Sequence, residues 1–183
     1  MKKNNEVVEW IKSILFALIL VFGINYFLFS PIVVDGESMM PTLESGNRMI
    51  LNKVNYVFKE PERFDIIVYH AKENEDHIKR VIGLPGDRIE YRDDVLYING
   101  EAYEEEYLDE YKNEVTDLPL TGDFTLEDTP VNGQVVPENH LFVMGDNRRH
   151  STDSRILGAV PFEEIAGQAN IVVWPLKNIG IIE

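Results

Sequence analysis

The feature that most constrains this chain is an uncharged, apolar run near the N-terminus. Residues 13–34 read SILFALILVFGINYFLFSPIVV and hold no charged side chain over 22 residues. A helix of that length spans the hydrocarbon core of a bilayer, which is about 30 Å thick. The run is apolar on every side, whereas a helix packed on a globular core has one apolar face. It therefore predicts a transmembrane helix, with Pro31 as the residue that ends it.

The charges around this run predict its orientation. Three lysines lie among residues 1–12, and the next basic residue is Arg48. Basic residues concentrate on the cytoplasmic side of membrane helices, so residues 1–12 are expected in the cytoplasm and residues 35–183 outside. A cleavable signal peptide is the alternative, but the exit sequence at 32–35, I-V-V-D, lacks the small residues of a cleavage site. We expect a single-pass protein of the cell membrane, with the lipid bilayer as one partner.

Composition narrows the class of protein further. The chain has 183 residues, which suits one domain with a lobe inserted in it. Acidic side chains outnumber basic ones by 32 to 17, and the formal net charge is −15. Binding to nucleic acid needs a basic face, so nucleic acid is not an expected partner. The absence of cysteine excludes disulfides, thiolate metal sites and a cysteine nucleophile.

After residue 43 the sequence changes to short runs rich in β-branched and aromatic residues, which predict strands. Pro85-Gly86 has the residue order of a type II turn, and Asn99-Gly100 is typical of a tight hairpin. One short helical turn is expected over residues 161–166. The predicted strands cover residues 48–51, 64–70, 77–82, 88–91, 95–98, 101–103, 140–144 and 171–174. The chain is therefore expected to be mostly β, with a membrane helix in front.

Residues 101–114 form an acidic, tyrosine-rich segment, EAYEEEYLDEYKNE. A divalent-cation site is one interpretation, but nothing in the segment resembles an EF-hand loop. The interpretation we favour is a solvated face.

Three polar segments carry the candidate chemistry. Residues 36–43, G-E-S-M-M-P-T-L, follow the apolar run directly and place the Ser38 hydroxyl just outside the membrane. Residues 77–87, HIKRVIGLPGD, place Lys79 in an otherwise apolar strand, where a lysine must reach solvent, pair with an acid or lose its proton. Residues 145–155, GDNRRHSTDSR, hold short polar side chains that can brace a site. Taken singly, these segments also fit a surface serine, a paired lysine and a solvated turn.

Together, in this order and after an N-terminal anchor, the three segments resemble the bacterial type I signal peptidases of the Gram-positive type (peptidase family S26). These are membrane-bound serine endopeptidases that remove signal peptides from exported preproteins. The resemblance implies an antiparallel β-sheet catalytic core, about residues 35–87 and 139–183, with a smaller β-rich lobe inserted at about 88–138. It also implies signal peptides as partners, cleavage after small residues at −3 and −1, and no metal or organic cofactor. Oligomeric state is left open.

The resemblance assigns a role to individual residues. Ser38 is the implied nucleophile and Lys79 the implied general base, with Ser151 orienting the lysine amine. Asp153 and Arg155 match positions that support the site. The residues implied to line the substrate pockets are Val34, Met39, Leu43 and Ile78. Gly36 stands where some relatives carry a serine that donates to the oxyanion, so the second donor is left open beside the Ser38 N–H.

The physical chemistry of the pair agrees with these roles. A serine needs a base, and a lysine acts as one only when it is neutral near pH 7. The reference pKa of lysine is about 10.4, and full burial lowers it by up to about 3–5 units. Serine–lysine pairs are a known variant of the catalytic triad. A Ser-His-Asp arrangement built on His150 is the rival, although neighbours in sequence seldom meet correctly in space.

Two other functions remain as alternatives. A self-cleaving serine–lysine regulatory protease shares the chemistry, but the anchor argues against it and no DNA-binding helix-turn-helix precedes the domain. An anchored β adhesion module is the non-enzymatic alternative, and it leaves the segments around Lys79 and Ser151 unexplained. Substitution of Ser38 separates the classes, because an adhesion module does not depend on that hydroxyl.

Overall fold

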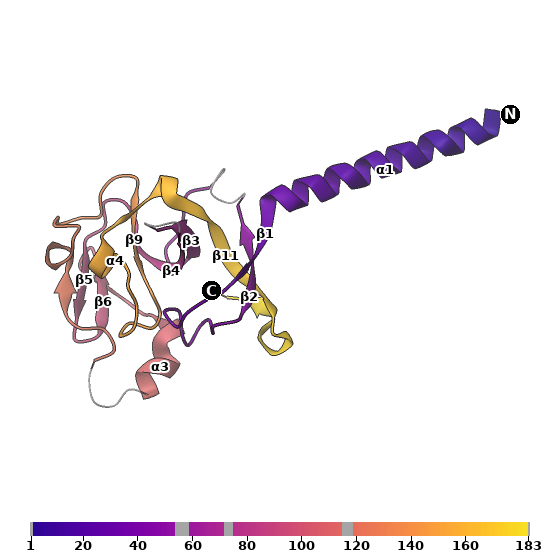
Figure 1. Cartoon of the computed structure of the whole chain (residues 1–183). Helices are drawn as coiled ribbons and strands as arrows, with labels where there is room; N and C mark the ends of the chain where they lie inside the picture. The colour runs from indigo at the N-terminus through magenta and orange to yellow at the C-terminus, as the bar shows by residue number, and fades with distance from the viewer. Residues whose placement is uncertain (1, 54–58, 72–74, 115–118, 183) are drawn as a thin grey trace.

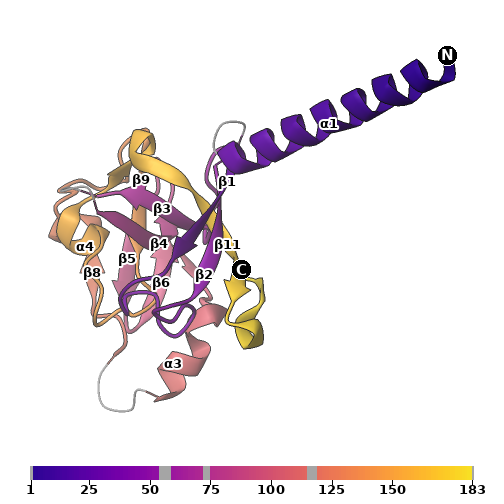
Figure 2. The ribbon, with the colours of Figure 1, turned by 45° about the vertical axis from the view of Figure 1, so that its right-hand side comes forward.

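The computed structural model has a long N-terminal helix that projects from a β-rich body (Figure 1). It describes residues 2–53, 59–71, 75–114 and 119–182, without the side chains of residues 2–7, 22, 24–27, 110 and 114. The body consists mainly of antiparallel strands, so the predicted fold class is confirmed for this part of the chain. Figure 2 shows the helix leaving the body at β1, away from the smaller sheet.

The helix ends earlier than the apolar run predicts. Helix α1 covers Lys2–Leu28, and the chain then forms strand β1, Phe29–Val33. Strand β1 pairs antiparallel with β2, and Pro31 is tolerated there because β1 lies at the edge of the sheet and needs hydrogen-bond partners on one side only. Within the part of the chain that the structure describes, no helix has the length and apolarity of a membrane span, so the span predicted for residues 13–34 is not found there.

The larger sheet carries the candidate site. Its strand order is β1-β2-β11-β3-β4-β9-β10, and β12 pairs with β11. Its strands after β1 are β2 (Arg48–Asn52), β3 (Ile66–His70), β4 (Asp76–Gly83), β9 (His140–Met144), β10 (Val160–Pro161), β11 (Ile165–Trp174) and β12 (Gly180–Ile181).

A smaller sheet is formed by chain that lies between β4 and β9 in sequence. Its order is β7-β6-β5-β8, from β5 (Ile89–Arg92), β6 (Val95–Ile98), β7 (Glu101–Tyr103) and β8 (Phe124–Thr125). The remaining described helical segments are η1 (Glu106–Leu108), α3 (Asp109–Glu114), η2 (Leu126–Asp128), α4 (Ser154–Leu157), η3 (Phe162–Glu164) and η4 (Leu176–Asn178). The helical turn expected over residues 161–166 is limited to η3, because β11 already begins at Ile165.

Both predicted turns are confirmed. The Asp87 N–H donates to the Leu84 carbonyl at 3.0 Å, and Gly86 has φ 83°, as the third residue of a type II turn requires. Asn99 and Gly100 both have positive φ, 54° and 86°, and join β6 to β7. A pair of positive φ values is the signature of the type I′ hairpin turn.

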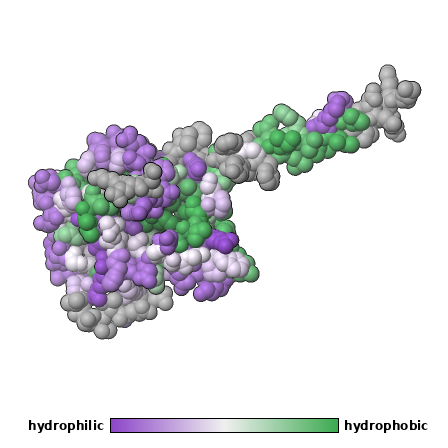
Figure 3. Space-filling view, in the orientation of Figure 1, coloured by the Kyte–Doolittle hydropathy of each residue, from purple (hydrophilic) through white to green (hydrophobic). Residues whose placement is uncertain are grey.

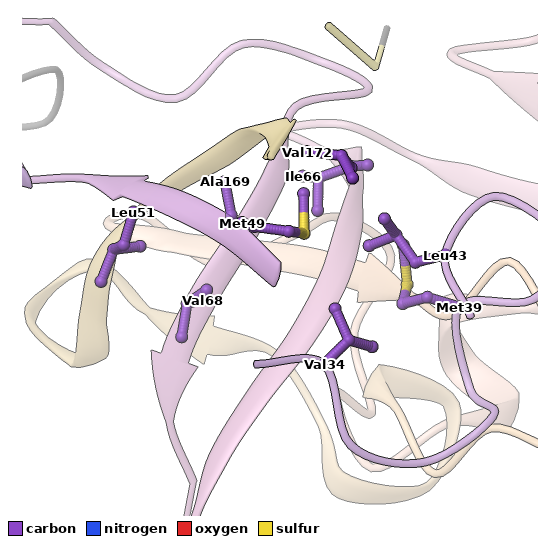
Figure 4. Packing of buried hydrophobic residues seen from close by; sticks show 9 residues of the cluster. All are labelled: Val34, Met39, Leu43, Met49, Leu51, Ile66, Val68, Ala169 and Val172. Carbon is purple, nitrogen blue, oxygen red and sulfur yellow. The ribbon is translucent and has the colours of Figure 1, made fainter. Parts of the chain in front are cut away.

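An apolar cluster fastens the loop after β1 to the larger sheet (Figure 4). Val34, Met39 and Leu43 come from the loop and are at most 3% exposed. They pack against side chains of β2, β3 and β11, among them Met49 and Ile66. Full burial of a side chain of this size contributes about 1.5–3 kcal/mol, so three of them hold the loop firmly in place. The loop contains Ser38.

Candidate active site

The Ser38 loop is fixed by a second loop from far along the chain. The Asn147 N–H donates to the Ser38 carbonyl at 3.0 Å, and the Asn147 side-chain amide donates to the Glu37 carbonyl at 3.1 Å. Both bonds join residues more than a hundred positions apart, so the tertiary structure, and not the local sequence, sets the serine's orientation. Ser38 itself is half-buried.

Lys79 meets Ser38 in the middle of β4. Its Nζ donates to the Ser38 Oγ at 2.7 Å, and the residue is 4% exposed. Burial lowers the pKa of Lys79 from 10.5 to about 8, although the carboxylates of Asp153 and Asp146 act in the opposite direction. A substantial share of such a lysine is neutral near pH 8. The pair therefore has the geometry of a hydroxyl and an adjacent base.

The next residue of β4, Arg80, was not singled out from the sequence. It is fully buried and forms a two-bond ion pair with Asp146, at 3.0 Å and 2.9 Å. Its guanidinium also donates to the Phe64 carbonyl and lies 3.8 Å from the centre of the Tyr107 ring. The sequence did contain a signal for this pair: a second charged residue in an apolar strand, and an aspartate in the polar segment 145–155.

Ser151 does not hydrogen-bond to Lys79. Its Oγ is buried and has no hydrogen-bond partner among the described residues. The hydroxyl lies instead against the backbone of Gly145, where a Cβ would overlap both the Ser151 Oγ and the Ser38 carbonyl oxygen. Gly145 is thus a site residue that the sequence reasoning missed, since only the folded chain brings the Gly145 backbone together with the Ser38 carbonyl and the Ser151 side chain.

Asp153 and Arg155 brace the same loop. The Asp153 carboxylate is completely buried and accepts hydrogen bonds from the Gly145 N–H at 3.0 Å and from the Arg155 guanidinium, twice, at 2.8 Å. It also caps the N-terminus of α4. Burial alone would raise the pKa of Asp153, but the Arg155 charge and hydrogen bond outweigh it and hold the pKa below its usual value. The carboxylate therefore stays ionised and keeps the loop in place.

A cleft of about 710 Å³ opens beside the pair. Ser38 and Lys79 line it, together with Val34, Met39 and Ile78 of the predicted pocket residues. Leu43, also predicted to line a pocket, is absent from the lining and completely buried in the cluster of Figure 4, so the structure gives it a packing position.

His150 lies in the cleft wall, but no described hydrogen bond joins it to Ser38. The serine's described side-chain partner is Lys79, so the geometry does not support the rival arrangement built on His150.

The backbone around Ser38 leaves room for an oxyanion. Among the described residues, the Ser38 N–H donates to no other backbone group. Gly36 has φ 90°, which favours glycine, while a Cβ added to it would meet no atom within 4 Å. A serine at this position would therefore have space, at the cost of backbone strain.

The acidic segment 101–114 is not simply a solvated face, as the sequence led us to expect. Glu105 is 4% exposed and pairs with Arg148, and Leu108 is completely buried. The Tyr111 hydroxyl donates to the Asn147 side chain at 3.0 Å. The segment thus reaches the polar loop that holds Ser38, because residues at intervals of three along it, Glu105, Leu108 and Tyr111, face inward.

Comparison with known proteins agrees with this site. Residues 7–174 match the model of the family described as signal peptidase, peptidase S26. The chain is 52% identical over 163 residues to signal peptidase I of Bacillus caldolyticus, covering 88% of each chain. It is 45% identical over 182 residues to signal peptidase I P of Bacillus subtilis subsp. natto, covering 97% of this chain and 95% of the other.

A solved structure points the same way. The crystal structure of a signal peptidase I from Enterococcus faecalis V583 matches with a TM-score of 0.58 and 45% identity, over 60% of this chain and 97% of the other. The fold and site define a serine hydrolase on an antiparallel β body. The chain belongs to the signal peptidase I family, peptidase S26.

Proposed function

We propose that the protein is a membrane-anchored serine endopeptidase that removes signal peptides from exported preproteins. Ser38 is the nucleophile and Lys79 the general base. The observation that carries the proposal is the 2.7 Å contact between the Lys79 Nζ and the Ser38 Oγ, with a lysine pKa of about 8. The family match and the names of the relatives support the substrate class.

The reaction follows from this pair. Neutral Lys79 takes the Ser38 proton as the Oγ bonds to the scissile carbonyl carbon. The resulting oxyanion accepts a hydrogen bond from the Ser38 N–H, which has no described backbone partner. The lysine ammonium then protonates the departing amine as the peptide bond breaks, and the mature protein leaves. Lys79 next accepts a proton from a water that attacks the acyl-serine carbonyl. As the acyl–Oγ bond breaks, the Lys79 ammonium returns that proton to the Ser38 Oγ, and the signal peptide leaves with a C-terminal carboxyl group, which ionises in solution.

The cleft supports recognition of an extended peptide. Residues 76–79 of β4 pair with β3 on one side, while pairing with β9 begins only at Arg80. No described strand pairs with the other edge of 76–79, which lies along the cleft, where a substrate strand can add to the sheet. Val34, Met39 and Ile78 give the cleft apolar walls, which suit small side chains at −1 and −3. Asp153, Arg155 and Ser151 support the geometry, with Gly36 beside the nucleophile.

The proposed location is the cell membrane, with residues 1–12 in the cytoplasm and the peptidase domain outside. The described surface of α1 is largely hydrophobic (Figure 3), and most of its large apolar side chains are about half exposed or more. The β11–β12 end of the larger sheet adds exposed Trp174, Leu176, Ile179 and Ile181. Trp174 pairs with Arg48 of β2, which pairs with Val33 of β1, so this apolar surface lies near the same edge of the sheet as β1 but at the end of β1 opposite the helix. Both features support contact with lipid.

The test is cleavage of a preprotein followed by N-terminal sequencing of the product. The wild-type protein is expected to release one mature N-terminus, after a residue with small side chains at −1 and −3. Ser38→Ala and Lys79→Ala are expected to remain folded, by circular dichroism, and to release none. Cleavage by the Ser38→Ala protein would assign the activity to another group. Flotation with lipid vesicles tests the anchor, and a full chain that stays in the aqueous fraction would refute it.

A further inference from the structure

We propose that Tyr111 of the inserted lobe is a positioning residue, which strengthens the hydrogen-bond donor to the oxyanion by acting through Asn147. The inference rests on the function proposed above, since it concerns the same reaction. Tyr111 lies in α3, and Figures 1 and 2 both show this helix beside the loop that follows β1 and contains Ser38. Tyr111 is not among the described residues that line the cleft, so its effect on cleavage must pass through another residue.

The hydrogen bonds of Asn147 define the direction of this link. Its side-chain nitrogen donates to the Glu37 carbonyl at 3.1 Å, and its side-chain oxygen lies 3.0 Å from the Tyr111 hydroxyl. A carbonyl oxygen can only accept, so the Asn147 nitrogen must face Glu37 and its oxygen must face Tyr111. The Tyr111 hydroxyl is therefore the donor. The backbone N–H of Asn147 also donates to the Ser38 carbonyl, at 3.0 Å.

The Glu37 carbonyl belongs to the same planar peptide group as the Ser38 N–H, the proposed oxyanion donor. This peptide bond is trans, so its C=O and N–H point in opposite directions, with Asn147 on the carbonyl side. The Met40 N–H donates to the same carbonyl at 3.1 Å, so two donors fix the plane of the group. A carbonyl that accepts hydrogen bonds polarises its peptide group and makes the N–H a stronger donor. The bond from Tyr111 strengthens the Asn147 amide in the same way.

The lobe holds Tyr111 in place for this role. Leu108, which ends η1 directly before α3, is completely buried. Next to Tyr111, the Lys112 ammonium donates to the Asp94 carbonyl, in the turn between β5 and β6, at 3.4 Å. Asn147 is only 6% exposed, so water competes little for its side chain. The Tyr111 hydroxyl is thus anchored on one side and donates to a shielded amide on the other.

The first experiment compares preprotein cleavage by the wild-type protein and by Tyr111→Phe, which keeps the ring and removes only the hydroxyl. We expect kcat to fall about fivefold, the effect of one hydrogen bond, with KM unchanged, because the oxyanion is absent from the bound substrate. Tyr103→Phe, at a half-buried tyrosine of β7 whose hydroxyl makes no described hydrogen bond, is the matched control and should keep the wild-type kcat. A wild-type kcat in Tyr111→Phe would overturn the inference.

The pH profile separates an effect on the oxyanion from an effect on the base. The described hydrogen bond of Tyr111 does not reach Lys79, so the rising limb of kcat/KM should stay near pH 8 in Tyr111→Phe. A limb displaced from that of the wild-type protein would assign the loss of activity to Lys79 and overturn the inference.

A double-mutant cycle tests whether Tyr111 acts through Asn147. In the Asn147→Ala background no side-chain amide remains to carry the effect, so adding Tyr111→Phe should change kcat by less than about twofold. A role limited to packing of the lobe would give the same loss in both backgrounds, and that result would contradict the proposal.

A pair of inhibitors keeps the test decisive if Asn147→Ala fails to fold. The first is a signal-peptide fragment that ends in an aldehyde. The Ser38 Oγ adds to the aldehyde carbon, the serine proton passes to Lys79, and the aldehyde oxygen becomes the oxyanion. The second ends in the corresponding primary alcohol, which forms no such adduct. Tyr111→Phe should weaken inhibition by the aldehyde about fivefold and leave inhibition by the alcohol unchanged. Equal affinity of both proteins for the aldehyde would refute the role of Tyr111.

The outcomes separate the two proposals. A wild-type protein that cleaves no preprotein refutes the proposed function itself. A wild-type protein that cleaves, together with a Tyr111→Phe protein that cleaves equally fast, refutes only the role of Tyr111. Circular dichroism melts establish that each variant compared is folded at the assay temperature.

Discussion

At the scale of single residues, the two neighbouring basic side chains of β4, Lys79 and Arg80, have different partners. Arg80 has a buried carboxylate partner in Asp146, with two hydrogen bonds. Lys79 makes no ion pair with any described residue, and its close partner is the neutral Ser38 hydroxyl. A buried guanidinium keeps its proton and needs a counterion, whereas a buried ammonium can lose its proton instead. The strand thus holds one structural cation and one group that is able to act as a base.

The pH dependence of cleavage tests the state of Lys79. Since the base must be neutral and its pKa is about 8, kcat/KM should rise with pH along a limb centred near that value. Lys79→Arg should be inactive at every pH, because a guanidinium stays charged. Measurable cleavage by the arginine variant would mean that Lys79 contributes charge, and His150 in the cleft wall would be the next candidate base.

The pH dependence of the free energy of unfolding should show the same lowered pKa of Lys79. Below pH 8 the folded protein carries the Lys79 charge at a cost, and this cost disappears as the pH rises from about 8 to 10.5, where only the unfolded chain binds the proton. At about 1.4 kcal/mol per pKa unit, Lys79→Met should raise the free energy of unfolding by about 3 kcal/mol at pH 7 and by about 1 kcal/mol at pH 10. Urea unfolding at both pH values measures this. The control is Lys177→Met at an exposed position, and an equal gain at both pH values would contradict the prediction.

Gly145 offers a test of the backbone contact behind the nucleophile. Gly145→Ala places a Cβ against the Ser38 carbonyl and Ser151, so it should lower stability by about 1–3 kcal/mol and sharply reduce cleavage. Gly122→Ala is the control, because a Cβ there meets nothing within 4 Å. Thermal unfolding and preprotein cleavage are the measurements. A fully active Gly145→Ala protein would show that the Ser38 loop and the loop of residues 145–155 can separate without loss of cleavage activity.

At the scale of elements, β1 decides where the peptidase domain begins. The strand pairs with β2 along its whole length, and Val34, just after it, is 3% exposed. Residues 29–34 continue the apolar run that begins in α1, but they form the edge strand of the sheet and contribute Val34 to the core. We therefore predict that a fragment starting at residue 35, the domain boundary expected from the sequence, is less stable than one that keeps β1 and Val34.

Two truncations test this boundary. A protein that starts at Phe29 should unfold at nearly the temperature of the full chain, since the sheet stays complete. A protein that starts at Asp35 loses the edge strand and Val34, and the loss of Val34 burial alone should cost about 2 kcal/mol. Circular dichroism melts in detergent compare the two. Equal melting temperatures would show that β1 does not contribute to the thermal stability of the domain.

At the scale of the whole molecule, one buried arginine joins the smaller sheet to the candidate site. The Arg148 guanidinium pairs with Glu105 and donates to the Tyr91 hydroxyl at 2.7 Å and to the Thr121 hydroxyl at 3.2 Å. Its Nε also donates to the Gly145 carbonyl at 3.1 Å. The lobe thus supports the backbone on which Ser38 rests.

Removing the counterion of Arg148 should weaken this link. Glu105→Gln leaves a completely buried guanidinium without its carboxylate, which costs about 3–5 kcal/mol for a buried pair. Glu104→Gln, at an exposed neighbouring position, should have almost no effect. Urea unfolding gives the stabilities, and cleavage assays at a temperature where both variants are folded show whether the site loosens too. Equal stabilities would mean that the ion pair makes no net contribution.

The sequence by itself determined what depends on neighbouring residues. Strand periodicity, the Pro85-Gly86 and Asn99-Gly100 turns and the apolar run before Ser38 are local signals, because backbone conformation there follows from the residues present. Tertiary structure decided the rest: the end of α1 at Leu28, the Arg80–Asp146 and Glu105–Arg148 pairs, and the core position of Leu43. It also decided the pKa of Lys79. These outcomes depend on which distant segments pack together, since strand pairing, ion-pair geometry and desolvation are properties of the assembled neighbourhood and not of the residue alone.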